Sequence, residues 1–148
     1  MKNKNGFKFE KLIIWQKAME LGENIDFITN EFQHKELYSL SSQIRRAVDS
    51  VALNISEGAI AQSSSENRKF LGYSIRSLAE VVTCLHKAKL RKYISDNEFN
   101  NLYEFSFNLM NMILAFRNKM LNKMKTGKQG SSDFLLRASG FQQKHSLS

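Results

Sequence analysis

The chain has 148 residues, 42% of them hydrophobic, which is enough for one domain with a packed core. It contains no proline and only 7 glycines, a composition that disfavours a β-rich fold and favours long helices. Its single cysteine excludes an intramolecular disulfide and a cysteine-based metal site, and its formal charge of +8 invites a polyanionic partner such as nucleic acid.

The N-terminal part begins with a short basic arm, residues 1–8, and continues into a predicted amphipathic helix. Apolar residues recur there every three or four positions: Ile14, Ala18, Leu21, Ile25, Ile28 and Phe32. A short link at residues 32–35 should end this helix. The apolar run near the N-terminus is too short for a signal peptide and no segment has membrane length, so we expect a cytoplasmic protein without membrane contact.

The stretch of residues 36–62 carries two regular stripes at helical spacing, and it predicts the helix around which the others pack. The first stripe is apolar and contains Leu37, Leu40, Ile44, Val48, Val51 and Ile55. The second stripe, one residue out of phase, is small and polar and contains Gln43, Ala47, Ser50, Asn54, Glu57 and Ala61. A solvated face normally carries long side chains, whereas small residues allow backbones to approach. We therefore predict that this helix is packed on two sides.

The second stripe also predicts a buried polar cluster between this helix and the next. The residues expected in the cluster are Gln43, Ser50, Asn54, Glu57, Ser74, Ser77 and Glu80. Buried polar groups need partners, so replacing Asn54 or Glu57 with alanine should destabilise the fold by a few kcal/mol, because the partner is left unsatisfied.

Two capping boxes predict where the third and fourth helices begin. Ser63 with Glu66 opens a helix to about Lys92, and Ser95 with Glu98 opens another. The core stripe of the third helix is Leu71, Ser74, Leu78, Val81, Leu85 and Ala88. The core stripe of the fourth is Phe99, Leu102, Ser106, Leu109, Ile113, Phe116 and Met120.

Short connections make consecutive helices antiparallel, so residues 1–124 are predicted to form an all-α, left-handed, up-down-up-down four-helix bundle. From Lys125 onward the periodicity stops, and residues 125–148 are rich in Gly and Ser. We predict a flexible basic tail there. Alternatively, the brief apolar island at residues 134–136 docks on a neighbouring molecule.

Three groups of basic residues are candidate contacts to nucleic-acid phosphates. Arg45 and Arg46 point about 100° apart on a helix, and either phosphate contact or pairing with Asp49 or a carboxylate across an interface explains them. Arg68 and Lys69 open the third helix, where the helix dipole disfavours cations and an external anion is favoured. The third group is Lys87, Lys89, Arg91 and Lys92. This last group forms either a solvated helix end or, with Lys2, Lys4, Lys8 and Lys11, a basic rim in a symmetric assembly.

The sequence gives little support for a catalytic site or a metal site. Di-iron bundles need two Glu-x-x-His motifs and two further glutamates, and only Glu31 with His34 has that spacing. Cys84 has the character of a small core residue, and no Ser or Cys stands in a recognisable His/Asp setting. We therefore expect no catalytic residues, no metal, no cofactor and no enzymatic activity.

Three blocks resemble the four-helix bundle protein family, also known as the 23S ribosomal RNA intervening-sequence proteins. They are FEKLIIWQKAMEL, LYSLSSQIRRAVDSVALNISEG and SENRKFLGYSIRSLAEVVTCL, within a match over residues 9–120 whose most specific parts are QIRRA and NISEG. The resemblance implies an up-down bundle that assembles into a ring-like homopentamer, without an established activity. A related accessory protein of diversity-generating retroelements has a similar bundle and binds nucleic acid. Where the family often carries proline, this chain has Gln33 and Ala52, so its second helix should be straighter.

Charge, cation placement and the resemblance together predict a non-enzymatic, basic homo-oligomer that binds RNA or DNA through backbone phosphates. The alternative is a scaffold ring that recruits an acidic protein partner, with the basic surface serving mainly solubility.

Overall fold

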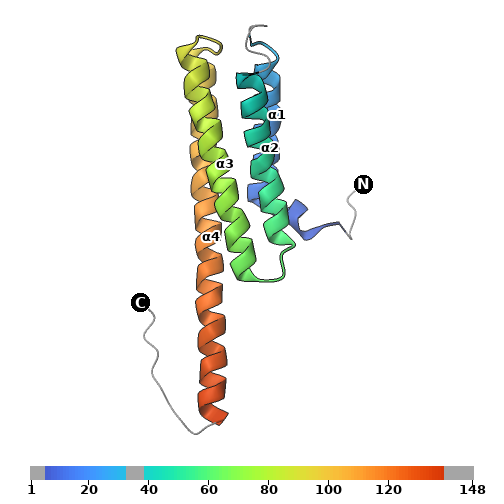
Figure 1. The fold of residues 1–148 in the computed structure, drawn as a ribbon, viewed down its shortest axis with the longest axis vertical. Coiled ribbons are helices and arrows are strands. Elements are labelled where there is room, and N and C mark those ends of the chain that lie inside the picture. Colours follow the sequence, from blue (N-terminus) through green and yellow to red (C-terminus); the bar gives the residue numbers. More distant parts are fainter. Residues whose placement is uncertain (1–5, 33–38, 139–148) are drawn as a thin grey trace.

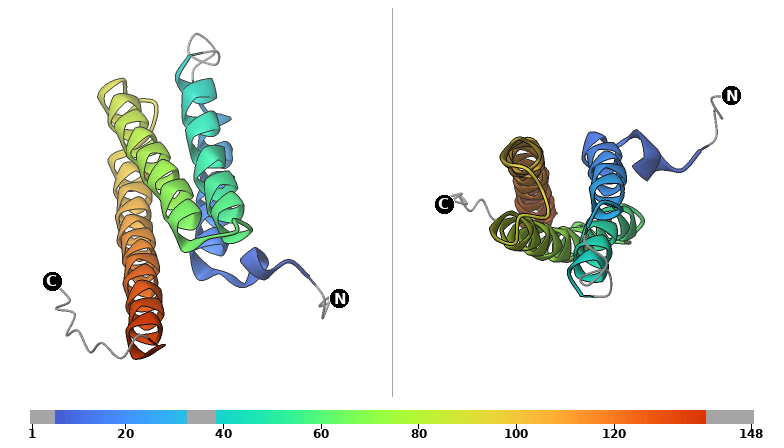
Figure 2. Two further views of the ribbon diagram at one scale, coloured as in Figure 1. Left: turned by 60° about the horizontal axis from the view of Figure 1, so that its bottom comes forward. Right: turned by 90° about the horizontal axis from the view of Figure 1, so that it is seen from above.

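The computed structural model describes residues 6–32 and 39–138, with residues 127–138 as helix backbone only. These residues form four α-helices, as predicted, and a short 3₁₀ helix, η1, which was not predicted. Their bounds are η1 (Lys8–Lys11), α1 (Ile13–Thr29), α2 (Leu40–Ala59), α3 (Ser64–Leu90) and α4 (Asp96–Ala138). Figure 1 shows that the four long helices run alternately up and down, and Figure 2 shows α1 and α2 on one side of the bundle and α3 and α4 on the other.

Both predicted helix starts are confirmed. The Glu66 N–H donates to the Ser63 hydroxyl at 3.1 Å at the start of α3. At the start of α4 the capping is reciprocal: the Glu98 N–H donates to the Ser95 hydroxyl at 3.0 Å, and the Ser95 N–H donates to the Glu98 carboxylate at 2.9 Å. These local bonds satisfy backbone N–H groups that have no partner inside the helix.

The predicted apolar stripes meet in one core along the axis of the bundle. Its largest fully buried side chains include Leu21, Ile25, Leu40, Ile44, Ile55, Leu71, Leu78, Leu85, Leu109 and Ile113. The serines in two of the stripes are buried as well. Ser74 donates to the Val51 carbonyl at 2.8 Å and so joins α3 to α2, whereas Ser106 donates to the Leu102 carbonyl of its own helix at 2.7 Å.

The last helix is longer than expected. Regular structure was predicted to end near residue 124, but α4 continues to Ala138 and extends beyond the other helices (Figure 1). No proline interrupts this stretch, and cations near a helix C-terminus are favourable, so nothing in the sequence forces the helix to stop. Residues 139–148 lie outside the described part.

Two further expectations concern α2. The helix runs without interruption through the buried Ala52, the position at which the resemblance led us to expect a straighter helix. The predicted link near Gln33 and the first apolar position, Leu37, lie outside the described residues. None of the helices in the described part combines the length and the apolar character needed to cross a membrane.

Candidate nucleic-acid interface

The predicted basic groups lie at opposite ends of the bundle. Arg68 and Lys69 stand in the second turn of α3, and the α3 C-terminal cluster (Lys87, Lys89, Arg91 and Lys92) stands at the other end of the same helix. A helix of 27 residues is about 40 Å long. The two groups therefore cannot contact one short stretch of nucleic acid.

The predicted basic rim is not formed within one protomer. Lys8 and Lys11 belong to η1, which lies at the end of the bundle away from the α3 C-terminal cluster (Figure 1). The end of α1 and the start of α2 lie at the cluster's end of the bundle, not at the end of η1 (Figure 1). Lys2 and Lys4, the other expected members, lie outside the described residues.

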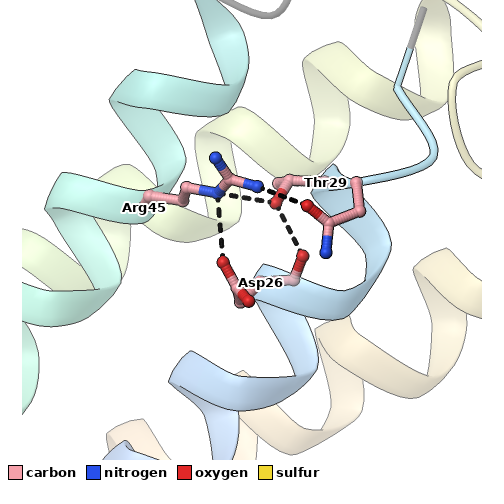
Figure 3. Close-up of polar contacts among 4 residues, drawn as sticks. Asp26, Thr29 and Arg45 are labelled. Carbon is pink, nitrogen blue, oxygen red and sulfur yellow. Dashed lines mark hydrogen bonds and ion pairs between the residues drawn. The ribbon is translucent and has the colours of Figure 1, made fainter.

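Arg45 holds two helices together. Its Nε donates to the Thr29 hydroxyl at 2.9 Å and lies 3.3 Å from an Asp26 carboxylate oxygen, while its Nη2 donates to the Asn30 side-chain oxygen at 2.9 Å (Figure 3). The expected pairing with a carboxylate is thus present, but with Asp26 of α1 in place of Asp49. The guanidinium also lies at the C-terminus of α1, where the helix dipole favours a cation.

We expect Arg45→Gln to lower the free energy of unfolding by about 1–2 kcal/mol, because three acceptors of α1 lose a charged donor. The side chain is 34% exposed, so solvent moderates the loss. Denaturant unfolding followed by circular dichroism measures it. Arg46→Gln is the matched control, since Arg46 is exposed and, among the residues that the structure describes, bonds only to the Ser42 carbonyl of its own helix. Equal effects of the two substitutions would contradict the assigned role of Arg45.

The α3 C-terminal cluster is exposed and lies beside aromatic rings. The Lys89 Nζ lies 4.5 Å from the centre of the Phe99 ring, which stacks on Tyr103 with the ring centres 5.6 Å apart. The His86 ring meets Phe99 edge-on at 4.9 Å. Cations next to aromatic faces are typical of surfaces that hold single-stranded nucleic acid.

The backbone turn that ends α3 presents this cluster. The Tyr93 N–H donates to the Ala88 carbonyl at 2.9 Å and the Lys92 N–H donates to the Lys89 carbonyl at 3.0 Å, a Schellman motif. Its left-handed position is normally glycine, but here it is Lys92, with φ at 60°. A lysine in this position costs backbone energy, and it adds a charge to the cluster.

At the start of α3, Arg68 is half-buried and Lys69 is exposed, with its Nζ 5.2 Å from the Phe70 ring centre. The structure adds a residue that the sequence analysis missed. Arg117 of α4 is half-buried, and its Nε donates to the Arg68 carbonyl at 3.0 Å. Burial lowers the pKa of Arg117, and the neighbouring Arg68 charge lowers it further.

Small members of the predicted polar cluster are joined by hydrogen bonds. The Ser77 hydroxyl of α3 donates to the Ser50 hydroxyl of α2 at 2.8 Å. The Asn54 amide donates to the Ser50 carbonyl at 2.9 Å and to its hydroxyl at 3.0 Å. With the buried Ser74, these residues line the contact of α2 with α3, so the helix is packed on two sides as predicted.

The predicted burial of the carboxylates is wrong. Glu57 and Glu80 are exposed, and the half-buried Gln43 reaches a Glu80 oxygen only at 3.5 Å on the outside of the bundle. Burying a carboxylate without a cation is costly, and their stems are long enough to reach water. The large loss of stability expected for Glu57→Ala therefore has no basis in the structure.

In the part of the chain that it describes, the structure adds no evidence for a metal site or a catalytic nucleophile. Within the described residues, no group of three or more His, Cys, Asp or Glu side chains could hold a metal ion. Glu31 is exposed, and its expected partner His34 lies outside the described residues. Cys84 is a buried core residue, as predicted; burial raises the pKa of its thiol, and the Glu80 carboxylate raises it further.

Two apolar grooves mark the outer faces of the bundle. The larger, about 510 Å³, lies between α1 and α2, where Trp15, Met19 and Leu53 line it beside Glu23 and Asp49. The smaller, about 240 Å³, lies between α3 and α4 and is lined by residues that include Tyr103 and Phe107. Exposed apolar surface of this kind is typical of protein–protein contacts.

Comparison with known proteins identifies a matching family and a similar solved structure. The model of a family described as "23S rRNA-intervening sequence protein" matches residues 10–115. A crystal structure of a protein with unknown function from the S23 ribosomal protein family of Bacteroides thetaiotaomicron VPI-5482 superposes with a TM-score of 0.67 at 19% identity. The superposition covers 71% of this chain and 98% of that one. No curated protein gives a significant match to the sequence.

Proposed function

We propose a function from the premise that this chain belongs to the 23S rRNA-intervening sequence protein family. The chain is a non-enzymatic, basic, homo-oligomeric bundle that binds RNA or DNA through the phosphate backbone. The family is not a known family of enzymes. Its name refers to an insert in ribosomal RNA, and the formal charge of +8 suits an anionic polymer.

The observation that carries this proposal is the α3 C-terminal cluster. Lys87, Lys89 and Lys92 are exposed, and none of them forms an ion pair within the described residues. Lys89 lies against the Phe99 ring, which stacks on the partly exposed Tyr103. Unpaired cations supply attraction to phosphates, and an accessible ring supplies a stacking surface for a base.

Filter binding of ribosomal RNA fragments tests the proposal. We expect the logarithm of the binding constant to fall linearly with the logarithm of salt concentration, at a slope of about −0.9 per phosphate contact for a duplex. Four contacts would weaken binding about a hundredfold between roughly 50 and 200 mM salt. Absence of binding at about 50 mM salt would contradict the proposal.

The matched variants for this test are K87Q/K89Q and K17Q. The first removes two cations of the cluster, and we expect the salt slope to fall by about 2. The second removes a cation of α1 that pairs with Glu20 at 3.3 Å, and we expect little change. If K17Q, which removes one charge, costs half as much as K87Q/K89Q or more, binding follows net charge and the cluster is not the contact surface.

We also propose that the protein is a ring-shaped homo-oligomer, a pentamer by family likeness. The grooves on the α1/α2 side and the α3/α4 side are unlike surfaces. Contact between two unlike faces of identical copies repeats head to tail, and it closes into a ring when the rotation fits. Native mass spectrometry counts the copies of 17.1 kDa.

The same grooves support a second function, a scaffold ring that recruits a protein. Its partner would be acidic, to suit the basic ends of the bundle. A pull-down that keeps one acidic protein after nuclease treatment favours the scaffold, and loss of all co-purified material on nuclease treatment favours the nucleic-acid proposal.

A further inference from the structure

Two arginines meet at the contact between α3 and α4, at the end of the bundle opposite the α3 C-terminal cluster. The Arg117 Nε donates to the Arg68 carbonyl at 3.0 Å. One turn further along α3 is Gly72, and a Cβ added there would lie 3.4 Å from the Arg117 Nη2 and 3.8 Å from its Nε. Gly72 thus lies beside the Arg117 guanidinium, at a separation where an added Cβ would make ordinary van der Waals contact.

This arginine pair carries two positive charges that no acidic side chain of the described residues neutralises. The Arg68 Nε is buried and has no hydrogen-bond acceptor. Like charges in partly desolvated surroundings disfavour each other, as the lowered pKa of Arg117 indicates. Long arginine stems can cover apolar surface, but that role does not explain a buried Arg68 Nε without an acceptor among the described residues.

We propose that Arg68 and Arg117 together bind a phosphate group of a nucleic-acid backbone. Guanidinium groups present paired N–H donors whose geometry matches a phosphate. Both residues are half-buried and so reach the surface, and the Arg68 side chain can turn toward an anion without losing a bond at its Nε. An anion between them would remove their mutual repulsion.

The proposed phosphate site at Arg68 and Arg117 rests on the proposed function, and it adds a second contact surface for nucleic acid besides the α3 C-terminal cluster. Arg117 lies just beyond residues 10–115, which match the family model, so the site joins the shared bundle to the additional part of α4. It also explains the cations Arg68 and Lys69 near a helix start, where the dipole alone disfavours them.

The first experiment uses inorganic phosphate as the probe and the thermal midpoint as the readout. A ligand that binds only the folded state raises that midpoint. We expect phosphate to raise it above the value in chloride at equal ionic strength for the wild-type chain. R68Q/R117Q should lose that increment. The control R76Q/K119Q removes two exposed cations of the same helices, and it should keep the increment, including any general stabilisation by phosphate.

The second experiment measures nucleic-acid binding of the same proteins against salt. R68Q/R117Q should lower the salt slope by about 1–2, and R76Q/K119Q should lower it less. Circular dichroism melting checks that each variant folds. The arginine site is overturned if phosphate does not raise the thermal midpoint of the wild-type protein, or if both double variants lose equally in either measurement. Neither outcome contradicts the proposed function. A phosphate increment without any nucleic-acid binding overturns the nucleic-acid assignment and the proposed function together, and points to free phosphate.

Discussion

Replacing Leu78 with alanine is expected to lower the free energy of unfolding by about 3–5 kcal/mol. Leu78 is 0% exposed and lies at the middle of α3, the helix that packs against both α2 and α4. The substitution removes buried apolar contacts and leaves a cavity that rigid neighbouring helices fill only in part. Denaturant titration at equilibrium measures the loss.

Leu90→Ala is the control for this prediction. It makes the same chemical change in the last residue of the same helix, but Leu90 is 83% exposed. Its effect should stay within about 0.5 kcal/mol. A loss below about 1 kcal/mol for Leu78→Ala would mean that the α3 stripe is not the centre of the core.

Gly58→Val should cost about 3 kcal/mol, because the end of α2 touches the start of α3 at this glycine. A Cβ at position 58 would lie 2.6 Å from the Asn67 side-chain oxygen and 3.2 Å from both the Asn67 carbonyl oxygen and the Phe70 Cβ. Asn67 cannot move aside freely, because its amide also contacts the Met120 sulfur of α4 at 3.3 Å. The thermal midpoint should fall by roughly ten degrees.

Gly22→Val provides the matched control in α1, because a Cβ at position 22 has no atom within 4 Å. Valine is a better helix former than glycine, so this substitution should leave stability unchanged or raise it by a few tenths of a kcal/mol. Equal losses at the two glycines would show that backbone propensity, not close helix contact, explains Gly58.

The sequence predicted local features of the fold well. The Ser63 and Ser95 caps form as expected, because capping depends on residues only three positions apart. The apolar stripes predicted the core because residues three or four positions apart share one face of a helix. The small polar stripe predicted a polar contact between α2 and α3, but not its individual bonds: Ser77 bonds to Ser50, and Asn54 bonds to Ser50 of its own helix.

Features that depend on how two helices are aligned could not be predicted in the same way. Asp26 pairs with Arg45 because the last turn of α1 lies beside the first turns of α2, a relation that spacing along one helix does not reveal. Arg117 was missed because its partner surface, Arg68 with Gly72, lies on another helix. Glu57 shares the phase of Ser50, but phase alone does not tell whether a long charged side chain turns to water.

The length of α4 has a consequence for how this protein can be handled and how it can diversify. At 43 residues the helix is about 65 Å long, and its part beyond residue 115 lies outside the match to the family model. Reporter dyes or fused modules placed after Ala138 would be carried well clear of the core on a ready-made spacer. Mutations in the part of α4 that extends past the other helices (Figure 1) can accumulate with little effect on the packed bundle, so new specificity can evolve there at little risk to folding.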